Sequence, residues 1–169
     1  MRILLAVILS GTMSLASPEA IDQARLNLAA TDLVYLASPK GIDNARLNMT
    51  VNHLKELYPN NKVVQQDDLE GGLATVVEVY DIHNKLIFDA QIEEGKVYNL
   101  SSDNPAVRTA EGIGPGSVIE SANKNYGKPT LVHGEGLTCA VYKKKPGLSF
   151  CLDREVKLIE SIAVVHRVK

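Results

Sequence analysis

The sequence predicts an α+β fold, in which an antiparallel β-sheet has helices packed on one side and one disulfide lies within a hairpin. Apolar residues over 38–58 recur at the spacing of an amphipathic helix, whereas residues 62–100 change to the alternation typical of strands. The links between these strand segments are short, so successive strands are expected to run antiparallel. Two cysteines also stand symmetrically on either side of a lysine-rich turn.

The composition is that of one globular domain. The chain has 169 residues, of which 45% are hydrophobic and 22% are charged. Aromatic residues make up only 5% and Trp is absent, so the core must be built from Val, Ile, Leu and Ala. The net charge of −2 gives no broad positive field, and we therefore expect no nucleic-acid binding.

The N-terminus has the pattern of a secretory signal peptide. Arg2 supplies a positive charge, Ile3 to Leu9 form an apolar segment too short to span a bilayer, and Ser14-Leu15-Ala16 is a small-x-small cleavage site. We therefore expect cleavage after Ala16 and export to the periplasm or beyond. The alternative is a buried N-terminal strand or helix. No cysteine stands directly after the apolar segment, so lipid attachment there is not supported.

An internal repeat follows. The segment Leu15–Leu28 recurs as Leu36–Met49, with ten of the fourteen paired positions identical. Each copy carries a serine suited to the helix N-cap and then a proline, which are Ser38 and Pro39 in the second copy. The first copy is interpreted as a duplicated helical extension, or alternatively as part of a helical hairpin or partner-binding arm. The predicted organisation is a signal peptide over 1–16, an N-terminal helical extension over 17–37 and a single α+β domain over 38–169.

Strand segments are rich in β-branched residues and are separated by turns rich in Gly, Pro, Asp and Asn. The helix of the second copy is expected to end at Pro59-Asn60-Asn61, before the first strand. Strands are expected at Lys62–Gln66, Leu73–Tyr80, Leu86–Gln91, Lys96–Leu100, Ala106–Thr109, Thr130–His133, Leu137–Tyr142, Leu148–Leu152 and Lys157–Val168.

A short helix interrupts the strands after residue 116. Three glycines over 112–116 predict a loop that adopts positive φ. A serine followed three residues later by a glutamate has the spacing of a capping box, and a glycine stands where a helix C-cap belongs. The expected turn and cap residues are Gly112, Gly114, Gly116, Ser117, Glu120 and Gly127.

Cys139 and Cys151 are equally distant from Lys145, so a hairpin centred there places them opposite each other. In an oxidising compartment we expect them to form a disulfide if the register is right. In a cytosolic chain, two free buried thiols would be expected instead.

The segment GIGPGSVIESANKNYGKP, from Gly112 to Pro129, resembles a group of small bacterial envelope proteins. The chain is similar over about Ile42 to Leu152 to the RpoE-regulated lipoprotein family, a bacterial envelope domain of unknown function. It is more weakly similar to small outer-membrane assembly lipoproteins and to β-lactamase-inhibitor-like proteins. The resemblance implies an exported α+β domain and no enzymatic activity, although the lipidation cysteine of the lipoprotein family is missing.

No catalytic or cofactor-binding constellation is predicted. The GIGPG segment departs from a dinucleotide-binding fingerprint because its third glycine comes too soon and Pro115 interrupts it. His53, His83, His133 and His166 lack metal-ligand spacing, so no metal is expected. A weak anion site at the helix start near Ser117 remains an alternative.

We therefore predict a non-enzymatic periplasmic domain that binds another envelope protein or an anionic membrane surface. The alternatives are an inhibitor of a hydrolase, with the turn at Asp81–Lys85 or Lys143–Gly147 as its contact, or a hydrolase that uses turn carboxylates. The carboxylates are Asp67, Asp68, Glu70, Glu93 and Glu94. The residues predicted to contact a partner are Lys143, Lys144, Lys145 and His83.

Overall fold

The computed structural model describes residues 34–67, 72–134 and 137–165, and these contain two helices and twelve strands. The helices are α2 (Val51–Leu57) and α3 (Ile119–Tyr126). The strands are β1 (Tyr35–Ser38), β2 (Gly41–Ile42), β3 (Ala45–Arg46), β4 (Asn61–Asp67), β5 (Leu73–Tyr80), β6 (Leu86–Glu93), β7 (Lys96–Ser102), β8 (Val107–Arg108), β9 (Thr130–Gly134), β10 (Leu137–Val141), β11 (Leu148–Leu152) and β12 (Ile159–Val165).

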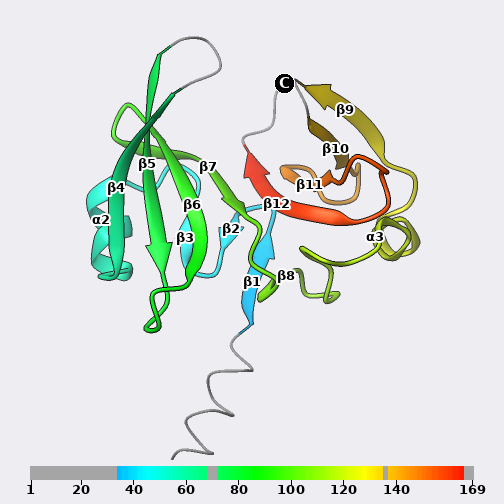
Figure 1. Cartoon of the computed structure of the whole chain (residues 1–169), viewed down its shortest axis with the longest axis horizontal. Coiled ribbons are helices and arrows are strands. Elements are labelled where there is room, and N and C mark those ends of the chain that lie inside the picture. The colour runs from blue at the N-terminus through cyan, green and yellow to red at the C-terminus, as the bar shows by residue number, and fades with distance from the viewer. Residues whose placement is uncertain (1–33, 68–71, 135–136, 166–169) are drawn as a thin grey trace, which may run out of the picture. The chain divides into compact units, whose positions relative to one another are not determined.

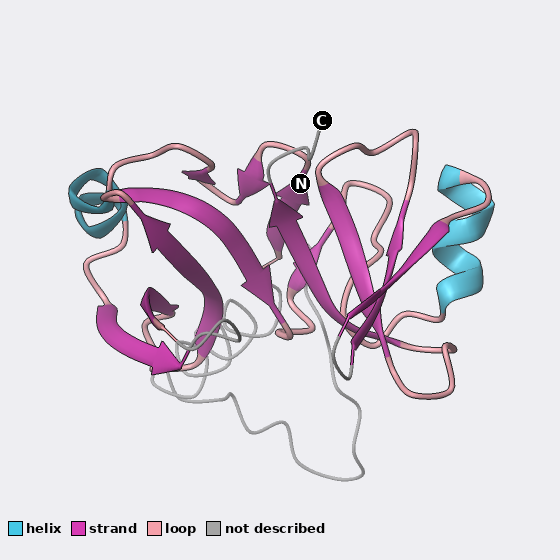
Figure 2. Cartoon of the chain, turned by 90° about the horizontal axis from the view of Figure 1, so that it is seen from above, coloured by secondary structure: helices cyan, strands magenta, loops and turns pink. Residues whose placement is uncertain are grey.

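Eight strands form one antiparallel sheet in the order β4-β5-β6-β7-β12-β11-β10-β9 (Figure 1). The two halves of this sheet meet where β7 pairs with β12, and these two strands are far apart in the sequence. A smaller sheet has the order β3-β2-β1-β8, in which β1 and β8 are parallel. Seen from above, α2 and α3 lie at opposite ends of the described structure (Figure 2).

The core lies on one face of the large sheet. Ala90 of β6 pairs with Leu100 of β7, Phe88 lies two residues before Ala90 on the same face of β6, and all three are fully buried. Their cluster continues through Ile162 and Phe150 in the other half of the sheet and includes buried residues of both helices and the small sheet. Full burial of a leucine, isoleucine or phenylalanine side chain contributes about 1.5–3 kcal/mol to the free energy of unfolding.

The predicted α+β class is wrong, because the described chain is mostly β and has two sheets. The helix predicted from Ser38 begins only at Val51, where the Thr50 side chain accepts a hydrogen bond from the His53 amide. Residues 35–46 form β1, β2 and β3 instead, and β1 extends across the predicted domain boundary at residue 38. The disulfide expected within a hairpin is confirmed.

Tertiary contacts explain why residues 38–49 do not form a helix. The Tyr58 hydroxyl accepts hydrogen bonds from the amides of Asn44 and Ala45, at 2.9 and 3.1 Å, and donates to the Asp43 carboxylate. Asp43 has a φ of 50°, which a continuous right-handed helix excludes. A Cβ added to Gly41 would lie 1.8 Å from the Ala45 carbonyl oxygen, so only glycine fits this close turn.

The predicted strands fit the structure better than the predicted helices do. β5 and β11 have the expected bounds, whereas β12 begins two residues later than expected. The proposed signal peptide and the first repeat copy lie outside the described residues. None of the helices in the described ranges is long and apolar enough to cross a membrane.

Candidate functional site

The disulfide fixes the register of the β10–β11 hairpin. Cys139 stands directly opposite Cys151, and the Cα–Cα distance is 3.9 Å. So short a separation is typical of a non-hydrogen-bonded antiparallel pair, for which about 4.5 Å is usual against about 5.5 Å for a hydrogen-bonded pair. The backbone N–H and C=O of Cys139 therefore point away from β11 and toward β9.

This register determines the outer edge of the sheet. Val132 of β9 is the partner of Cys139 and uses its N–H and C=O to pair with β10. Because successive residues of a strand direct their N–H and C=O groups to opposite sides, those of Leu131 and His133 point away from β10. β9 has β10 as its one strand neighbour in the described sheet, so these groups form the rim of the sheet.

The side chains of this edge are exposed and largely apolar. All five residues of β9 are exposed, with Leu131 at 41% and Val132 at 52%. Leu137, on the neighbouring strand, is 45% exposed and lies on the same face as Val132. We define the edge surface as Thr130–Gly134 together with Leu137.

A polar hollow adjoins the edge surface. His133 Nδ1 lies 3.0 Å from the Thr138 hydroxyl, and Thr138 also lines a cavity of about 470 Å³ with Leu152, Asp153, Arg154 and Glu160. The Asp153 carboxylate accepts hydrogen bonds from the amides of Lys157 and Leu158, which lowers its pKa. The Asp153 carboxylate therefore stabilises the turn before β12. Arg154 and Glu160 are the other charged residues that line this cavity.

The lysine-rich turn is tied to the segment before α3. Lys145 donates to the Glu111 carboxylate at 2.8 Å and lies 5.2 Å from the centre of the Tyr126 ring. The Tyr126 hydroxyl donates to the other Glu111 oxygen at 2.6 Å. The bonds from Lys145 and then Tyr126 lower the pKa of Glu111 to about 2. Because Lys145 is held here, the predicted partner contact keeps only Lys143 and Lys144 as exposed lysines.

The structure corrects the predicted role of Ser117. The N-cap of α3 is Val118, and no side chain caps the helix. The Ile119 amide donates instead to the Lys157 carbonyl, so the helix start is satisfied by the backbone just before β12. Ser117 Oγ accepts from Arg108 at 2.7 Å and from the Gly114 amide at 3.2 Å. The predicted capping box is therefore wrong.

Two of the three glycines before α3 have the predicted positive φ, and the glycine after α3 is the predicted C-cap. Gly112 and Gly116 have positive φ, and Gly127 is the C-cap, whose amide donates to the Asn123 carbonyl. A Cβ on Gly114 would lie 2.1 Å from the Val107 carbonyl oxygen. Glu120 lies in the first turn of α3, where a negative charge is favourable.

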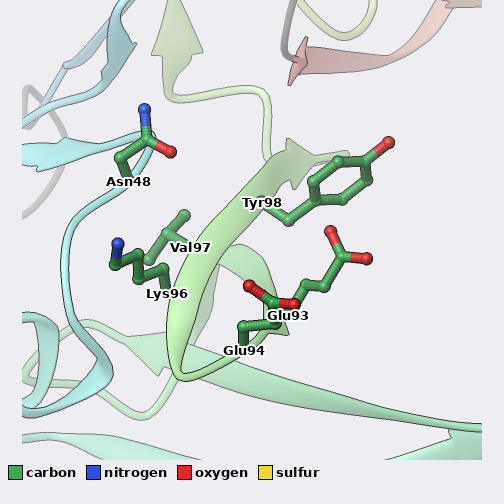
Figure 3. Close-up of a pocket in the computed structure, with 6 residues that line it drawn as sticks. All are labelled: Asn48, Glu93, Glu94, Lys96, Val97 and Tyr98. Carbon is green, nitrogen blue, oxygen red and sulfur yellow. The ribbon is translucent and has the colours of Figure 1, made fainter.

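A second cavity, of about 440 Å³, lies at the β6–β7 turn. Its lining side chains do not converge: those of Glu93 and Tyr98 project on one side of β7, and those of Lys96 and Asn48 lie on the other (Figure 3). Paired carboxylates for general acid–base chemistry would have to face a common point. This cavity is therefore a surface hollow rather than a gathered catalytic site.

Sequence reasoning missed Asp89. It stands directly across from Glu78 on the face of the sheet opposite the core. Burial, then the charges of Glu78 and Asp103, raise the pKa of Asp89 to about 6. No described group forms a hydrogen bond with Asp89 Oδ1 or with the buried Oδ1 of Asn99. The alternation in LIFDAQ places Asp89 away from the core, but only the strand register pairs it with Glu78.

The other predicted site residues are dispersed. His83 is exposed in the turn after β5, where its amide donates to Asp81 at 2.8 Å. His53, on α2, lies 3.6 Å from Glu56. Four predicted groups lie outside the described residues: Asp68, Glu70, His166 and the side chain of Asp67.

The comparisons identify a similar fold. No protein-family model matches the chain, and no curated protein matches it. The solved structure of the uncharacterized protein yfeY from Escherichia coli is similar, with a TM-score of 0.59 and 10% sequence identity. The match covers 78% of this chain and 99% of that one. The expected likeness to a bacterial protein is thus supported at the level of the fold.

Proposed function

We propose that this protein is an exported, non-enzymatic domain of the bacterial cell envelope that binds another envelope protein through its edge surface. The observation that carries this proposal is β9, a strand whose five residues are all exposed and whose rim backbone groups face away from the sheet. A partner strand can pair with such an edge through main-chain hydrogen bonds, with alternate side chains giving specificity.

The composition of β9 supports a binding role. Soluble proteins usually protect an exposed edge with a charged residue, a proline or a bulge. β9 has the sequence Thr-Leu-Val-His-Gly and its pairing with β10 is regular, so it has none of these. The opposite edge, β4, carries a charged residue, Lys62.

Export and family membership are parts of the same proposal. The N-terminal pattern supports cleavage after Ala16, and the disulfide fits an oxidising compartment. The similarity around Gly112 to Pro129 supports a place in the RpoE-regulated lipoprotein family. The fold likeness to a bacterial protein is consistent with that place.

Site-specific photo-crosslinking in bacterial cells tests the proposal. A photoreactive amino acid replaces Val132, and the matched control carries it at Val63, a 44% exposed valine of the other edge strand. We expect the mature protein in the periplasm to begin at Ser17 and to form an adduct of defined mass from position 132 alone. Equal adducts from both positions, or none from position 132, would contradict binding at this edge.

One observation favours the inhibitor alternative as a second candidate. Ile82 is 85% exposed at the tip of the β5–β6 turn. Asp81 Oδ1 accepts from the amides of His83 and Lys85, both at 2.8 Å, so the turn is held in shape. A rigid turn that presents an apolar side chain is suited to insertion into a hydrolase cleft. Replacement Ile82→Asp should abolish inhibition of envelope hydrolase activity if the candidate is right, whereas wild-type protein without any inhibitory effect would exclude it.

A further inference from the structure

We propose that β9 pairs with β9 of a second copy of this chain, antiparallel about a twofold axis that passes through Val132. This names the partner at the edge surface of the proposed function. The two large sheets would then join edge to edge into one continuous sheet.

The backbone groups of β9 match this self-pairing. Because Val132 uses its N–H and C=O toward β10, Leu131 and His133 are the residues whose groups face outward. With the axis at Val132, Leu131 of each copy stands opposite His133 of the other. Each of these two residue pairs exchanges two N–H···O bonds, which gives four hydrogen bonds, and Val132 faces Val132 as a non-hydrogen-bonded pair.

The side chains are compatible with a second copy. The strand contains no Asp, Glu, Lys or Arg, so self-pairing places no like charges directly opposite each other. Two Val132 side chains, each 52% exposed in the single chain, meet on one face, where Leu137 extends the apolar surface. On the other face Leu131 lies against His133 of the second copy.

The opposite edge does not offer the same match. β4 contains Lys62, and Lys62 lies 3.8 Å from Glu78 within its own sheet. A second copy paired along β4 would hold the Lys62 side chain against another strand and compete with the existing ion pair. β9, which has no Asp, Glu, Lys or Arg and no such ion pair, is therefore the better match for self-pairing.

The contact is small, so the association is expected to be reversible. Stable specific interfaces bury about 1,200–2,000 Å² in total. A pair of five-residue strands with one flanking leucine on each side is smaller than that range, because standard interfaces use about 20–30 residues a side. We expect a dimer that forms with rising protein concentration and dissociates on dilution.

Sedimentation velocity of the mature, disulfide-bonded protein over a wide concentration range tests the self-pairing. Wild type should pass from monomer to dimer. Val132→Lys places two ammonium groups opposite each other and should weaken the dimer at least tenfold, whereas Val63→Lys, an equivalent change on the other edge strand, should not. His133→Pro removes an outward N–H and should also weaken the dimer, whereas His133→Ala retains that N–H and should not.

The outcomes separate this inference from the proposed function. Far-UV circular dichroism identifies variants that remain folded, and His133→Pro stands in if Val132→Lys does not fold. Wild type that stays monomeric at the highest concentration would overturn self-pairing, and so would a dimer that Val132→Lys leaves intact. A monomer that still forms a position-132 adduct of a different mass would keep the proposed function and assign the edge to another protein.

Discussion

Replacing Asp89 with Asn should stabilise the protein at neutral pH. The Asp89 carboxylate stands across from Glu78 with one oxygen lacking a hydrogen-bond partner in the described structure. Its pKa is raised from 3.8 to about 6. A group whose folded pKa exceeds its unfolded value stabilises the fold when protonated, and that stability is lost as the pH rises from about 4 through 6.

The magnitude follows from this shift. A difference of about two pKa units corresponds to roughly 3 kcal/mol between the protonation states. Asp89 is only partly buried, so solvent screening reduces this figure, and we expect a gain of about 1–2 kcal/mol at pH 7.5. The gain should nearly vanish at pH 4, where Asp89 is largely protonated in the folded protein.

Urea denaturation of oxidised protein at pH 4, 6 and 7.5 measures this effect. The control is Glu93→Gln, which removes an exposed carboxylate from the same strand and should change the free energy of unfolding little at any pH. A loss of stability in Asp89→Asn at pH 7.5, or a gain that is the same at all three pH values, would refute the reasoning.

Three further predictions concern contacts made by residues 108–151. Lys145→Met should lower the free energy of unfolding by about 1 kcal/mol at pH 7, a modest amount because the ion pair with Glu111 is only partly buried. The lowered pKa of Glu111 makes the wild type lose stability between about pH 4.5 and pH 2, and this loss should be smaller in the variant. Unfolding measured across that pH range tests the difference. Reducing the disulfide, which spans a sequence separation of 12, should destabilise the fold by roughly 3 kcal/mol, and an unchanged melting temperature would contradict this. Ser117→Ala should cost about 1 kcal/mol through its lost hydrogen bond to Arg108, and an Arg108→Met double-mutant cycle should show coupling between the two residues that a helix cap would not produce.

Local signals predict the strands and the disulfide well. β5 and β11 begin and end where β-branched content and turn residues place them. Cys139 and Cys151 face each other because a short hairpin has one dominant register. These features depend on neighbours in the sequence, so a reading of the sequence can find them.

The failures arise where distant residues decide the structure. Ser38 and Pro39 have the local pattern of a helix start, but Tyr58 binds the backbone of residues 44 and 45 and holds a turn there. The Ser117 capping pattern likewise gives way to Arg108 and to the backbone before β12. Local propensity is overridden at both places by tertiary hydrogen bonds.

The candidate site could not be predicted because it depends on sheet order. The sequence predicts β9 as a strand, but its exposure follows from the pairing of β7 with β12, which places β9 at the end of the sheet. Asp89 meets Glu78 through the local β5–β6 hairpin, whose register shifts between Val79 and Tyr80. The lysine turn was predicted as a contact surface, yet Glu111, 34 residues away, holds Lys145.

Residue-resolved amide exchange of β9 tests most directly whether the sheet edge is the interaction surface. In dilute protein, the amides of Leu131 and His133 should exchange rapidly, whereas that of Val132 should be protected by its bond to β10. At concentrations where the protein associates, we expect Leu131 and His133 to become protected while Val132 changes little. Association that leaves the amides of Leu131 and His133 in rapid exchange would contradict the account.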